Sequence, residues 1–517
     1  MGLRTTYHAF FTAIVLLCTV GIGHAATSCC VRLQALDRSK VFWPNQSTYI
    51  AQNGNGILTD MPYWSQQGVA SPSCVFTAKS TQDVSNAVKI LHTYRCEYAI
   101  RSGGHNPIPG WSNTNGGVLL SASAINDVAV DPARRTVKFG AGCKWKDIYA
   151  KLDPLGLGVM GARDNTVGVG GFLLGGGISY YSNSNGWAAD HVIEYEVVYA
   201  DGTIGTISQS SNPDLFTAMK GAGAAFAIVT HFTQEVIPQG NYNGGFVFYP
   251  DTSIKPLLAA LYNYGTSGAI ADPKSHIIPS INSVGPELGG INIATFCFFY
   301  PTAIRADAEV PVFKPFTQDI FWAASTKRNR AGMNDLSGEI GGYSTPGRRQ
   351  SFTDMAIVLD YPNILQELWD IYQAVTAPYR LTILGYSANL IFYPLTRTFV
   401  AKGMENGKRN SMGLEGTAAG QAGKTIMIVS INLTWLAKEQ DGAAAACVGR
   451  AFAAMEARAR ARNVYHPFKY MNYANGTQDV LGSYGTNSAR RLQSVKRRVD
   501  PANDFGTLIK GRYRIPK

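Results

Sequence analysis

The chain has 517 residues, of which 45% are hydrophobic and 54 are glycine, and its net charge is +11. This length is too great for one ordinary hydrophobic core, so we expect two domains. A charged fraction of only 16% argues against disorder. No recognised nucleic-acid module accompanies the positive charge, so we expect no nucleic-acid partner.

The N-terminus has the pattern of a secretory signal. Arg4 precedes an apolar stretch from Ala9 to Ile22, and small residues stand before an expected cleavage after Ala25. The stretch is short for a membrane span. We therefore expect residues 1–25 to be removed and the mature protein to be secreted, with no stable membrane insertion.

Secretion permits disulfides and glycans. Cleavage leaves an odd number of cysteines, so at least one stays free or pairs outside the chain. These cysteines are Cys29, Cys30, Cys74, Cys96, Cys143, Cys297 and Cys447. Asn45, Asn432 and Asn475 stand in glycosylation sequences, and we expect a glycan on at least one of them.

The first half of the chain alternates short helices and short strands. Residues 26–60 show no strong periodicity and are expected along the surface. A helix is predicted from Ser80 to about Arg95, because Val84, Val88 and Leu91 fall on one helical face. Further helices are predicted at 145–152 and 213–220, and strands at 97–100, 118–120, 128–130, 137–139, 194–199, 203–207 and 226–236. This mixture predicts an α+β fold and not the repeated βαβ units of a parallel-sheet nucleotide fold.

The character of the chain changes near Gly240. Long runs rich in aromatic and β-branched residues predict strands at 246–249, 291–300, 356–359, 390–393 and 426–435. Helices are predicted at 254–264, 364–377 and 442–462. These elements predict a second domain, in which helices cover one face of a largely antiparallel sheet.

Two glycine-dense turns carry the functional signal. Arg101 to Asn106 reads Arg-Ser-Gly-Gly-His-Asn after a short strand, and Gly168 to Gly177 contains six glycines. Glycine lets a backbone approach a ligand closely, and consecutive amides bind anions. Two such turns suggest one long phosphate-bearing ligand between them. His105 could otherwise be a core histidine or a general base; no partner at ligand spacing supports a metal site.

These turns, together with Tyr470-Met471-Asn472-Tyr473, resemble the berberine-bridge-enzyme-like flavoproteins of the vanillyl-alcohol-oxidase superfamily, of the fungal secondary-metabolite type. The resemblance covers about 63–236 and about 465 to the C-terminus. It implies a PCMH-type FAD-binding domain made of residues 61–238 and a returning segment, 464–517. Residues 26–60 precede it, and 239–463 would be an inserted substrate domain whose sheet forms a roof over the flavin.

The resemblance also implies a covalent bond between FAD and His105 and a disulfide between Cys30 and Cys96. Some relatives attach the flavin a second time through a cysteine, but that position here is Asp164, so we expect a single linkage. The residues expected to bind the cofactor are Arg101, Ser102, Gly103, Gly104, His105, Asn106, Thr166, Val167, Gly170, Gly171, Gly176, Ile228, Val229 and Asn472.

Three residues are catalytic candidates. Tyr470 or Tyr473 would orient or deprotonate a substrate hydroxyl, although aromatic packing is an alternative role for each. If the motif is a strand, Tyr470 and Asn472 share one face and Tyr473 the other. In resembling enzymes the residue at Val167 lies over the flavin carbon that reacts with oxygen, and valine there is associated with oxidases.

The resulting prediction is a monomeric, FAD-linked oxidase of a small hydrophobic metabolite, an alcohol or an amine. It would transfer a hydride to flavin and use O2 as acceptor, giving H2O2. A flavoprotein cyclase, a carbohydrate oxidase and a non-enzymatic secreted binding protein are the alternatives.

Overall fold

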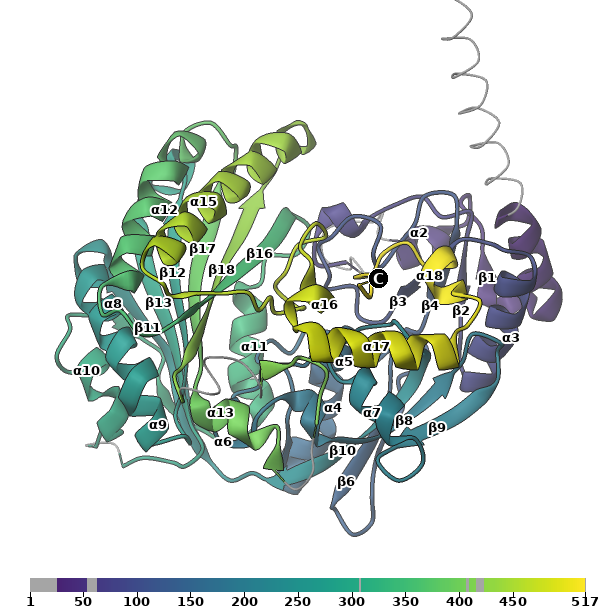
Figure 1. Ribbon diagram of the computed structural model, residues 1–517, viewed down its shortest axis with the longest axis horizontal. Helices are drawn as coiled ribbons and strands as arrows, with labels where there is room; N and C mark the ends of the chain where they lie inside the picture. Colours follow the sequence, from purple (N-terminus) through teal and green to yellow (C-terminus); the bar gives the residue numbers. More distant parts are fainter. Residues whose placement is uncertain (1–25, 54–62, 306–307, 406–408, 415–422, 517) are drawn as a thin grey trace, which may run out of the picture.

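The computed structural model describes residues 26–53, 63–305, 308–405, 409–414 and 423–516, so the expected signal of residues 1–25 lies outside the described residues. Three β-sheets flanked by helices form the molecule (Figure 1). Two small sheets come from the first half of the chain, and a nine-stranded sheet comes mostly from the second half. Within the described ranges, no helix is both long and apolar enough to cross a membrane.

The first sheet has the order β1–β2–β4–β3, with β2, β4 and β3 parallel. Helix α3 connects β2 to β3, and the Ser80 side chain caps it by accepting a hydrogen bond from the Asp83 amide. Val84, Val88 and Leu91 are buried, as the helical spacing predicts. The elements are α2 (Ser47–Asn53), α3 (Thr81–Thr93), β1 (Val41–Phe42), β2 (Cys74–Thr77), β3 (Tyr98–Arg101) and β4 (Val118–Ser121).

The second sheet is antiparallel and has the order β5–β6–β10–β8–β9, with β7 paired to β10. Its strands are β5 (Val128–Val130), β6 (Thr136–Gly140), β7 (Leu157–Val159), β8 (Val192–Val198), β9 (Ile204–Ser208) and β10 (Ile228–Pro238). The helices beside them are α4 (Trp145–Leu152), α5 (Val169–Leu174), α6 (Ser182–Asn185) and α7 (Pro213–Met219). Every strand predicted in this region is therefore matched, the short β7 was not predicted, and α4 has the predicted bounds.

The third sheet is antiparallel, with the order β14–β11–β13–β12–β17–β18–β16–β19 and β15 paired to β11. Strand β12 lies in its centre but was not predicted, because Pro279 and alternate polar residues interrupt the apolar pattern. The strands are β11 (Tyr242–Pro250), β12 (His276–Val284), β13 (Asn292–Tyr300), β14 (Ala324–Ser325), β15 (Arg328–Arg330), β16 (Arg349–Val358), β17 (Ser387–Leu395), β18 (Ile426–Trp435) and β19 (Tyr465–His466).

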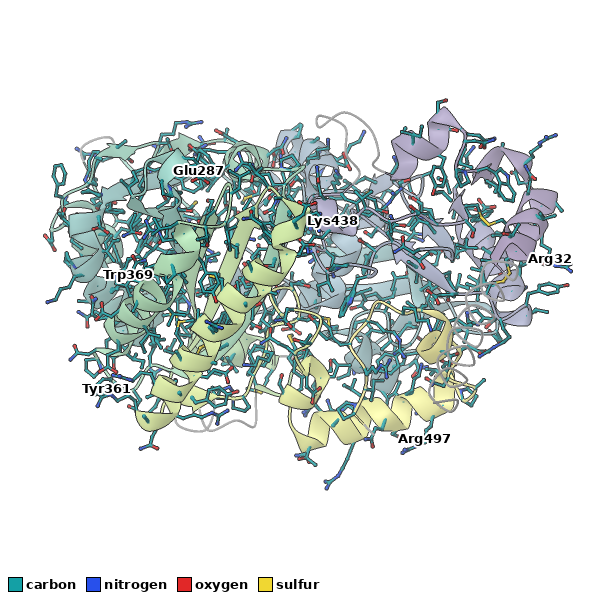
Figure 2. All side chains as sticks on the ribbon, turned by 90° about the horizontal axis from the view of Figure 1, so that it is seen from above. Arg32, Glu287, Tyr361, Trp369, Lys438 and Arg497 are labelled. Atoms are coloured by element: carbon teal, nitrogen blue, oxygen red, sulfur yellow. A yellow bond between two sulfur atoms is a disulfide. The ribbon has the colours of Figure 1, made fainter. Side chains whose placement is uncertain are left out.

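Helices cover one face of the third sheet, and its other face looks toward the two smaller sheets (Figure 1). Helix α15 packs on α12 and runs along the sheet from the end near Lys438 to the end near Tyr361 (Figure 2). The helices of this half are α8 (Ile254–Asn263), α9 (Ala269–Ala271), α10 (Lys314–Thr317), α11 (Met333–Tyr343), α12 (Ile364–Arg380), α13 (Arg397–Lys402) and α15 (Asp441–Ala461). The predicted antiparallel sheet with helices on one face is confirmed.

After β19 the chain crosses back to the smaller sheets through α16 (Val480–Ser483), α17 (Thr486–Val499) and α18 (Asp504–Leu508). Helix α17 packs on α7, and Ile509 forms a bridge with Tyr98 (Figure 1). The two ends of the described chain therefore build one body, and the nine-stranded sheet is inserted between them. This is the predicted α+β fold.

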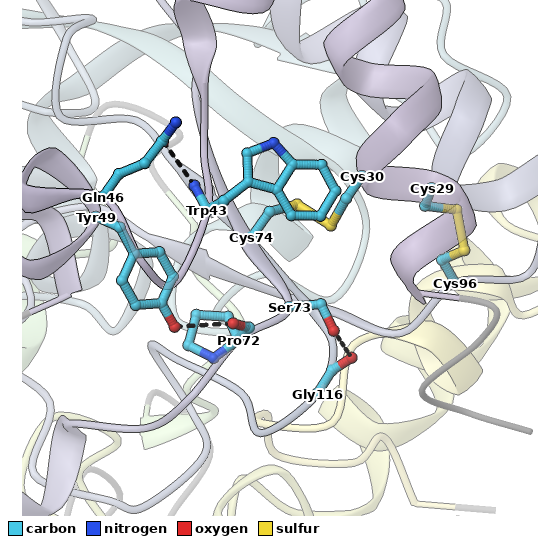
Figure 3. The surroundings of a disulfide bond; sticks show 10 residues. All are labelled: Cys29, Cys30, Trp43, Gln46, Tyr49, Pro72, Ser73, Cys74, Cys96 and Gly116. Atoms are coloured by element: carbon cyan, nitrogen blue, oxygen red, sulfur yellow. Dashed lines mark hydrogen bonds between the residues drawn. A yellow bond between two sulfur atoms is a disulfide. The ribbon is translucent and has the colours of Figure 1, made fainter. Parts of the chain in front are cut away.

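Two features of the N-terminal region differ from the prediction. Residues 26–36 form a helix, and Cys29, Cys30 and Leu33 on it are buried. Cys29 is bonded to Cys96 and Cys30 to Cys74, so the expected Cys30–Cys96 pair is wrong (Figure 3). Successive side chains on a helix point about 100° apart, so adjacent cysteines reach different partners.

Candidate active site

A cavity of about 730 Å³ lies between the smaller sheets and the inner face of the third sheet. The two glycine turns and the turn that contains Tyr470 open onto it, together with strands β11, β12, β16, β17 and β18. Most of the predicted site residues line this cavity, namely Ser102, Gly103, Gly104, His105, Asn106, Val167, Gly170, Gly171, Ile228, Val229, Tyr470, Asn472 and Tyr473.

The two glycine turns touch each other directly. A Cβ on Gly103 would lie 2.3 Å from the Gly168 Cα, and a Cβ on Gly168 would lie 2.5 Å from the Gly103 Cα. Any side chain at either position would push the turns apart. The Ser102 hydroxyl adds a second link, because it donates to the Ala141 carbonyl and accepts from the Gly170 amide at 3.2 Å.

Backbone amides of the first turn remain free to meet a ligand. The N–H groups of residues 103–106 donate to no acceptor in the described part of the chain. Gly104 has a φ of +70°, which glycine adopts without steric cost. Unpaired amides on a cavity wall are suited to an anionic group such as a pyrophosphate.

The His105 ring is fixed from two sides. It stacks on Trp64 with ring centres 4.7 Å apart, and its Nε2 lies 3.3 Å from the Thr166 Oγ1. The Thr166 hydroxyl donates its proton to Asp164 at 2.6 Å, which leaves its oxygen to accept from Nε2 in the tautomer whose Nδ1 keeps a lone pair. Burial lowers the pKa of His105 although the Asp164 carboxylate opposes this effect, which favours the neutral form of the ring.

Tyr470 to Tyr473 form a turn and not a strand, because the Tyr473 amide donates to the Tyr470 carbonyl at 2.9 Å. The rings of Tyr470 and Tyr473 meet edge to face, with centres 5.0 Å apart. The Asn472 side-chain amide donates to the Tyr470 hydroxyl and to the Phe172 carbonyl, each at 3.1 Å. Burial strongly raises the pKa of Tyr470, so this phenol stays protonated.

Tyr473 is held differently from Tyr470. Its ring stacks on Phe352 with centres 5.3 Å apart, and its oxygen accepts a hydrogen bond from the Arg163 guanidinium. Phe352 in turn stacks on Trp64 at 5.5 Å. A continuous row of rings therefore connects His105 to Tyr473 along one wall of the cavity.

Besides Phe352, the third sheet lines the cavity with neutral side chains. Asn282, Asn389 and Asn432 are direct cross-strand neighbours on β12, β17 and β18. Phe246 and Phe248 continue the wall on β11. Among the described residues of this sheet that line the cavity, none carries a charge.

Three of the predicted cofactor residues do not line the cavity. The Arg101 guanidinium donates to Tyr63 and Ser121 inside the first sheet. Gly176 has a φ of +103° and packs against Met412 and Trp187. Thr166 does not line the cavity itself, but its hydroxyl is hydrogen-bonded to His105, which does.

Several cavity residues were not predicted from the sequence. Arg163 directly precedes Asp164, which the sequence analysis discussed, but no local sequence pattern predicts its contact with Tyr473. The alternation of Phe246 and Phe248 is a signal that could have placed both on one sheet face. The other unpredicted lining residues include Trp64, Ser280, Asn282, Thr295, Phe352, Asn389, Asn432 and Arg512.

Comparison with known proteins defines the class. Residues 72–208 match the FAD binding domain family. An FAD-dependent monooxygenase of Fusarium proliferatum is 32% identical over 477 residues, covering 89% of each chain. The bifunctional solanapyrone synthase of Alternaria solani is 29% identical, over 94% of this chain and 88% of that protein.

Solved structures share the fold at lower identity. The 6-hydroxy-D-nicotine oxidase of Arthrobacter nicotinovorans superposes with a TM-score of 0.72 at 20% identity, covering 92% of this chain and 97% of that chain. A glucooligosaccharide oxidase of Acremonium strictum gives 0.70 at 17% identity, covering 95% and 100%. Fold and sequence together define an FAD-binding oxidoreductase. The chain belongs to the berberine-bridge-enzyme-like FAD-dependent oxidoreductases, and the relatives named above are fungal proteins.

Proposed function

We propose that this protein is a secreted FAD-linked oxidase of a small hydrophobic metabolite, with O2 as acceptor and H2O2 as product. The observation that carries the proposal is the convergence of both glycine turns, His105 and the Tyr470–Tyr473 turn on one cavity. The two disulfides and the N-terminal pattern support passage through an oxidising compartment.

The residues of the cavity fit FAD. The unpaired amides of residues 103–106 are suited to the pyrophosphate of FAD. The contact of Gly103 with Gly168 brings the backbones of both glycine turns to the cofactor. The cavity volume of about 730 Å³ is typical of cofactor sites. The cofactor residues predicted above that line the cavity would hold it. When bound, FAD supplies the two-electron oxidation.

His105 is the proposed attachment site, through Nδ1. Its ring is neutral, and Nε2 is occupied by Thr166. The flavin of the glucooligosaccharide oxidase is described as both cysteinyl and histidyl. Here Asp164 stands at the position of the second link in relatives, and its carboxylate bonds Thr166, which supports a single linkage.

The proposed substrate reacts at a hydroxyl and not at an amine. An ammonium group needs a carboxylate to replace its hydration, and among the described lining residues the one carboxylate is that of Asp164, which already accepts hydrogen bonds from Thr166. The amides of Asn282, Asn389 and Asn432 can donate to and accept from neutral oxygens. The aromatic side chains of Trp64 and Phe352 in the cavity wall favour a substrate with a flat, unsaturated ring system.

The relatives suggest two other reactions, and the structural neighbours suggest one other substrate class. Solanapyrone synthase supports a cyclisation, and the monooxygenases support transfer of an oxygen atom to the product. Structural neighbours that oxidise oligosaccharides support a sugar as substrate. Turnover with isotopically labelled O2 separates the three reactions, because an oxidase puts the label into peroxide, a monooxygenase puts it into product, and a cyclase can run without O2.

The linkage is tested on protein secreted by a eukaryotic host. After acid denaturation the yellow colour should stay with the polypeptide, and peptide mapping should place the flavin mass on the peptide with His105. His105→Ala should release all flavin on denaturation. Flavin on Cys143, or complete release from the wild type, would refute the proposal.

A further inference from the structure

Three asparagines form a row across the inner face of the third sheet. Asn282 on β12 pairs with Asn389 on β17, and Asn389 pairs with Asn432 on β18. Directly opposed residues of antiparallel strands point to the same face of a sheet, and all three asparagines line the cavity. Neighbouring strands lie about 4.8 Å apart, so the row presents an amide group at that interval.

Each amide is held at one end, and its other end is left for a ligand. The Asn432 nitrogen donates to the Ser351 carbonyl at 3.1 Å, which leaves the Asn432 oxygen. The Asn389 oxygen accepts from the Ser280 hydroxyl at 3.1 Å, which leaves the N–H groups of Asn389. The Asn282 nitrogen donates to a threonine hydroxyl on β13 at 3.4 Å, which leaves the Asn282 oxygen. The described part of the chain therefore presents an acceptor, a donor and an acceptor in line.

The surroundings of the row are apolar. Phe352 stands directly opposite Asn432 on the next strand, and Ile391, Phe246 and Phe248 also line the cavity from this sheet. A molecule with hydroxyls on every side, such as a sugar, would leave some of them against these side chains without hydrogen-bond partners, which costs free energy. The row therefore fits a molecule whose oxygens lie along one edge of an apolar body.

We propose that this row recognises an aromatic ring that carries oxygens at two meta positions, as in a resorcinol. Meta oxygens on one ring are separated by about 4.8 Å, the same interval as neighbouring strands, so each can meet its own amide. Ortho oxygens lie much closer together, and para oxygens point in opposite directions. The inference rests on the proposed function and names the substrate class of the same site.

The opposite edge of such a ring is where the reacting hydroxyl belongs. With the meta oxygens on the third sheet, that edge is directed toward the smaller sheets, from which the glycine turns and His105 line the cavity. A carbinol that is meta to both oxygens points to this side. The compound 3,5-dihydroxybenzyl alcohol has this arrangement, whereas 3,4-dihydroxybenzyl alcohol has the same atoms with its phenol oxygens side by side.

Binding is measured by calorimetry on the flavin-loaded protein with two isomers that lack the carbinol. The meta isomer is 3,5-dihydroxytoluene, and the ortho isomer is 3,4-dihydroxytoluene. The meta isomer should bind about 10-fold more tightly, because it can make one hydrogen bond that the ortho isomer cannot. In Asn389→Leu, which keeps a similar side-chain volume, this preference should fall to about 2-fold or less. The comparison of isomers in the wild type needs no variant to fold.

The same sheet offers a matched control. Asn243 on β11 donates to Asn329 at 3.0 Å and does not line the cavity. Asn243→Leu should keep the full preference for the meta isomer. Equal binding of both isomers by the wild type would refute the inference, as would an unchanged preference in Asn389→Leu or an equal loss in Asn243→Leu. Tighter binding of methyl β-glucoside than of the meta isomer would show that the row recognises a sugar instead.

Flavin reduction without oxygen separates this inference from the proposed function. The two benzyl alcohols would each give up two hydrogens and two electrons to the flavin and become aldehydes. The half-saturating concentration of 3,5-dihydroxybenzyl alcohol should be about 10-fold lower than that of the 3,4 isomer. If neither alcohol reduces the flavin while calorimetry still finds the preference, the proposed oxidation fails and recognition by the row stands. If both alcohols reduce it at equal half-saturating concentrations, the oxidase stands and the inference is wrong.

Discussion

At the scale of single residues, the hydrogen bonds from His105 to Thr166 and on to Asp164 determine which ring nitrogen is free. Thr166 has one proton and gives it to Asp164, which favours the tautomer whose ring donates from Nε2. The Thr166 hydroxyl, itself held by Asp164, orients the imidazole in the same way that hydrogen-bonded partners orient metal-bound histidines.

Removing the Thr166 hydroxyl should therefore reduce covalent attachment. We expect Thr166→Val to bind FAD but to retain several-fold less of it after acid denaturation, because the imidazole loses the partner that fixes its tautomer. Thr166→Ser, which keeps the hydroxyl, should behave like the wild type. Equal covalent fractions in all three proteins would contradict this role.

Val167 lines the cavity and also packs against the main core. Leucine adds one methylene, and close-packed interiors respond to a change of that size. We expect Val167→Leu to slow reoxidation of the reduced flavin in air-saturated buffer, with flavin reduction unchanged. Stopped-flow absorbance measures both rates; identical reoxidation would show that oxygen reaches the flavin by another route.

At the scale of elements, the N-terminal helix over residues 26–36 is held by two disulfides. Cys30–Cys74 closes a loop of 44 residues and ties the helix to β2. Replacing both cysteines with serine should lower the free energy of unfolding by about 2–4 kcal/mol. Denaturant unfolding measures the loss, and peptide mapping without reductant should find Cys29–Cys96 and Cys30–Cys74; a Cys30–Cys96 peptide would contradict the structure.

Strand β16 places Asp354 in a fully buried position against the Tyr470 turn. Burial raises the pKa of this carboxyl from 3.8 to about 7. Between these values the unfolded chain is ionised while the folded protein stays protonated. Stability is therefore fully present below about pH 4 and is lost as the pH rises toward 7.

Asparagine keeps the acceptor for the Tyr470 amide and removes this titration. We expect Asp354→Asn to gain stability over the wild type as the pH rises from about 4 to about 7, by at most about 1.4 kcal/mol per pH unit. The gain should level off above that range. Thermal melts across pH measure it, and a pH-independent difference would show that Asp354 does not titrate.

At the scale of the whole molecule, folding decides which glycosylation sequences are accessible. Asn45 is exposed, whereas Asn432 is 7% exposed and faces the cavity from a central strand. The Asn475 side chain donates to Thr353. Of the three asparagines, Asn45 is the most exposed.

We therefore expect glycan on Asn45 and none on Asn432 in protein secreted by a eukaryotic host. Asn45→Gln should remove one glycan mass, and Asn432→Gln should remove none. Mass spectrometry before and after enzymatic deglycosylation measures this. Edman sequencing of the same sample should begin near Ala26; an intact Met1 without glycan would contradict secretion.

Most of the local structure and the positions of the two glycine turns could be predicted from the sequence. Helices α3, α4, α12 and α15 and most strands follow from periodicity and capping, which depend on residues close in the chain. The turns around Gly103 and Gly168 can also be predicted from the sequence. A high local content of glycine indicates a backbone that lies close to a ligand or to another backbone.

Tertiary structure alone decided the pairing of the cysteines, the central place of β12, and the contacts of Arg163. Arg163 and Tyr473 are 310 residues apart, and they meet only because the C-terminal segment returns across the inserted sheet. Asn282, Asn389 and Asn432 likewise form a row only through strand register. No local pattern encodes such contacts, since they depend on how distant elements pack against one another.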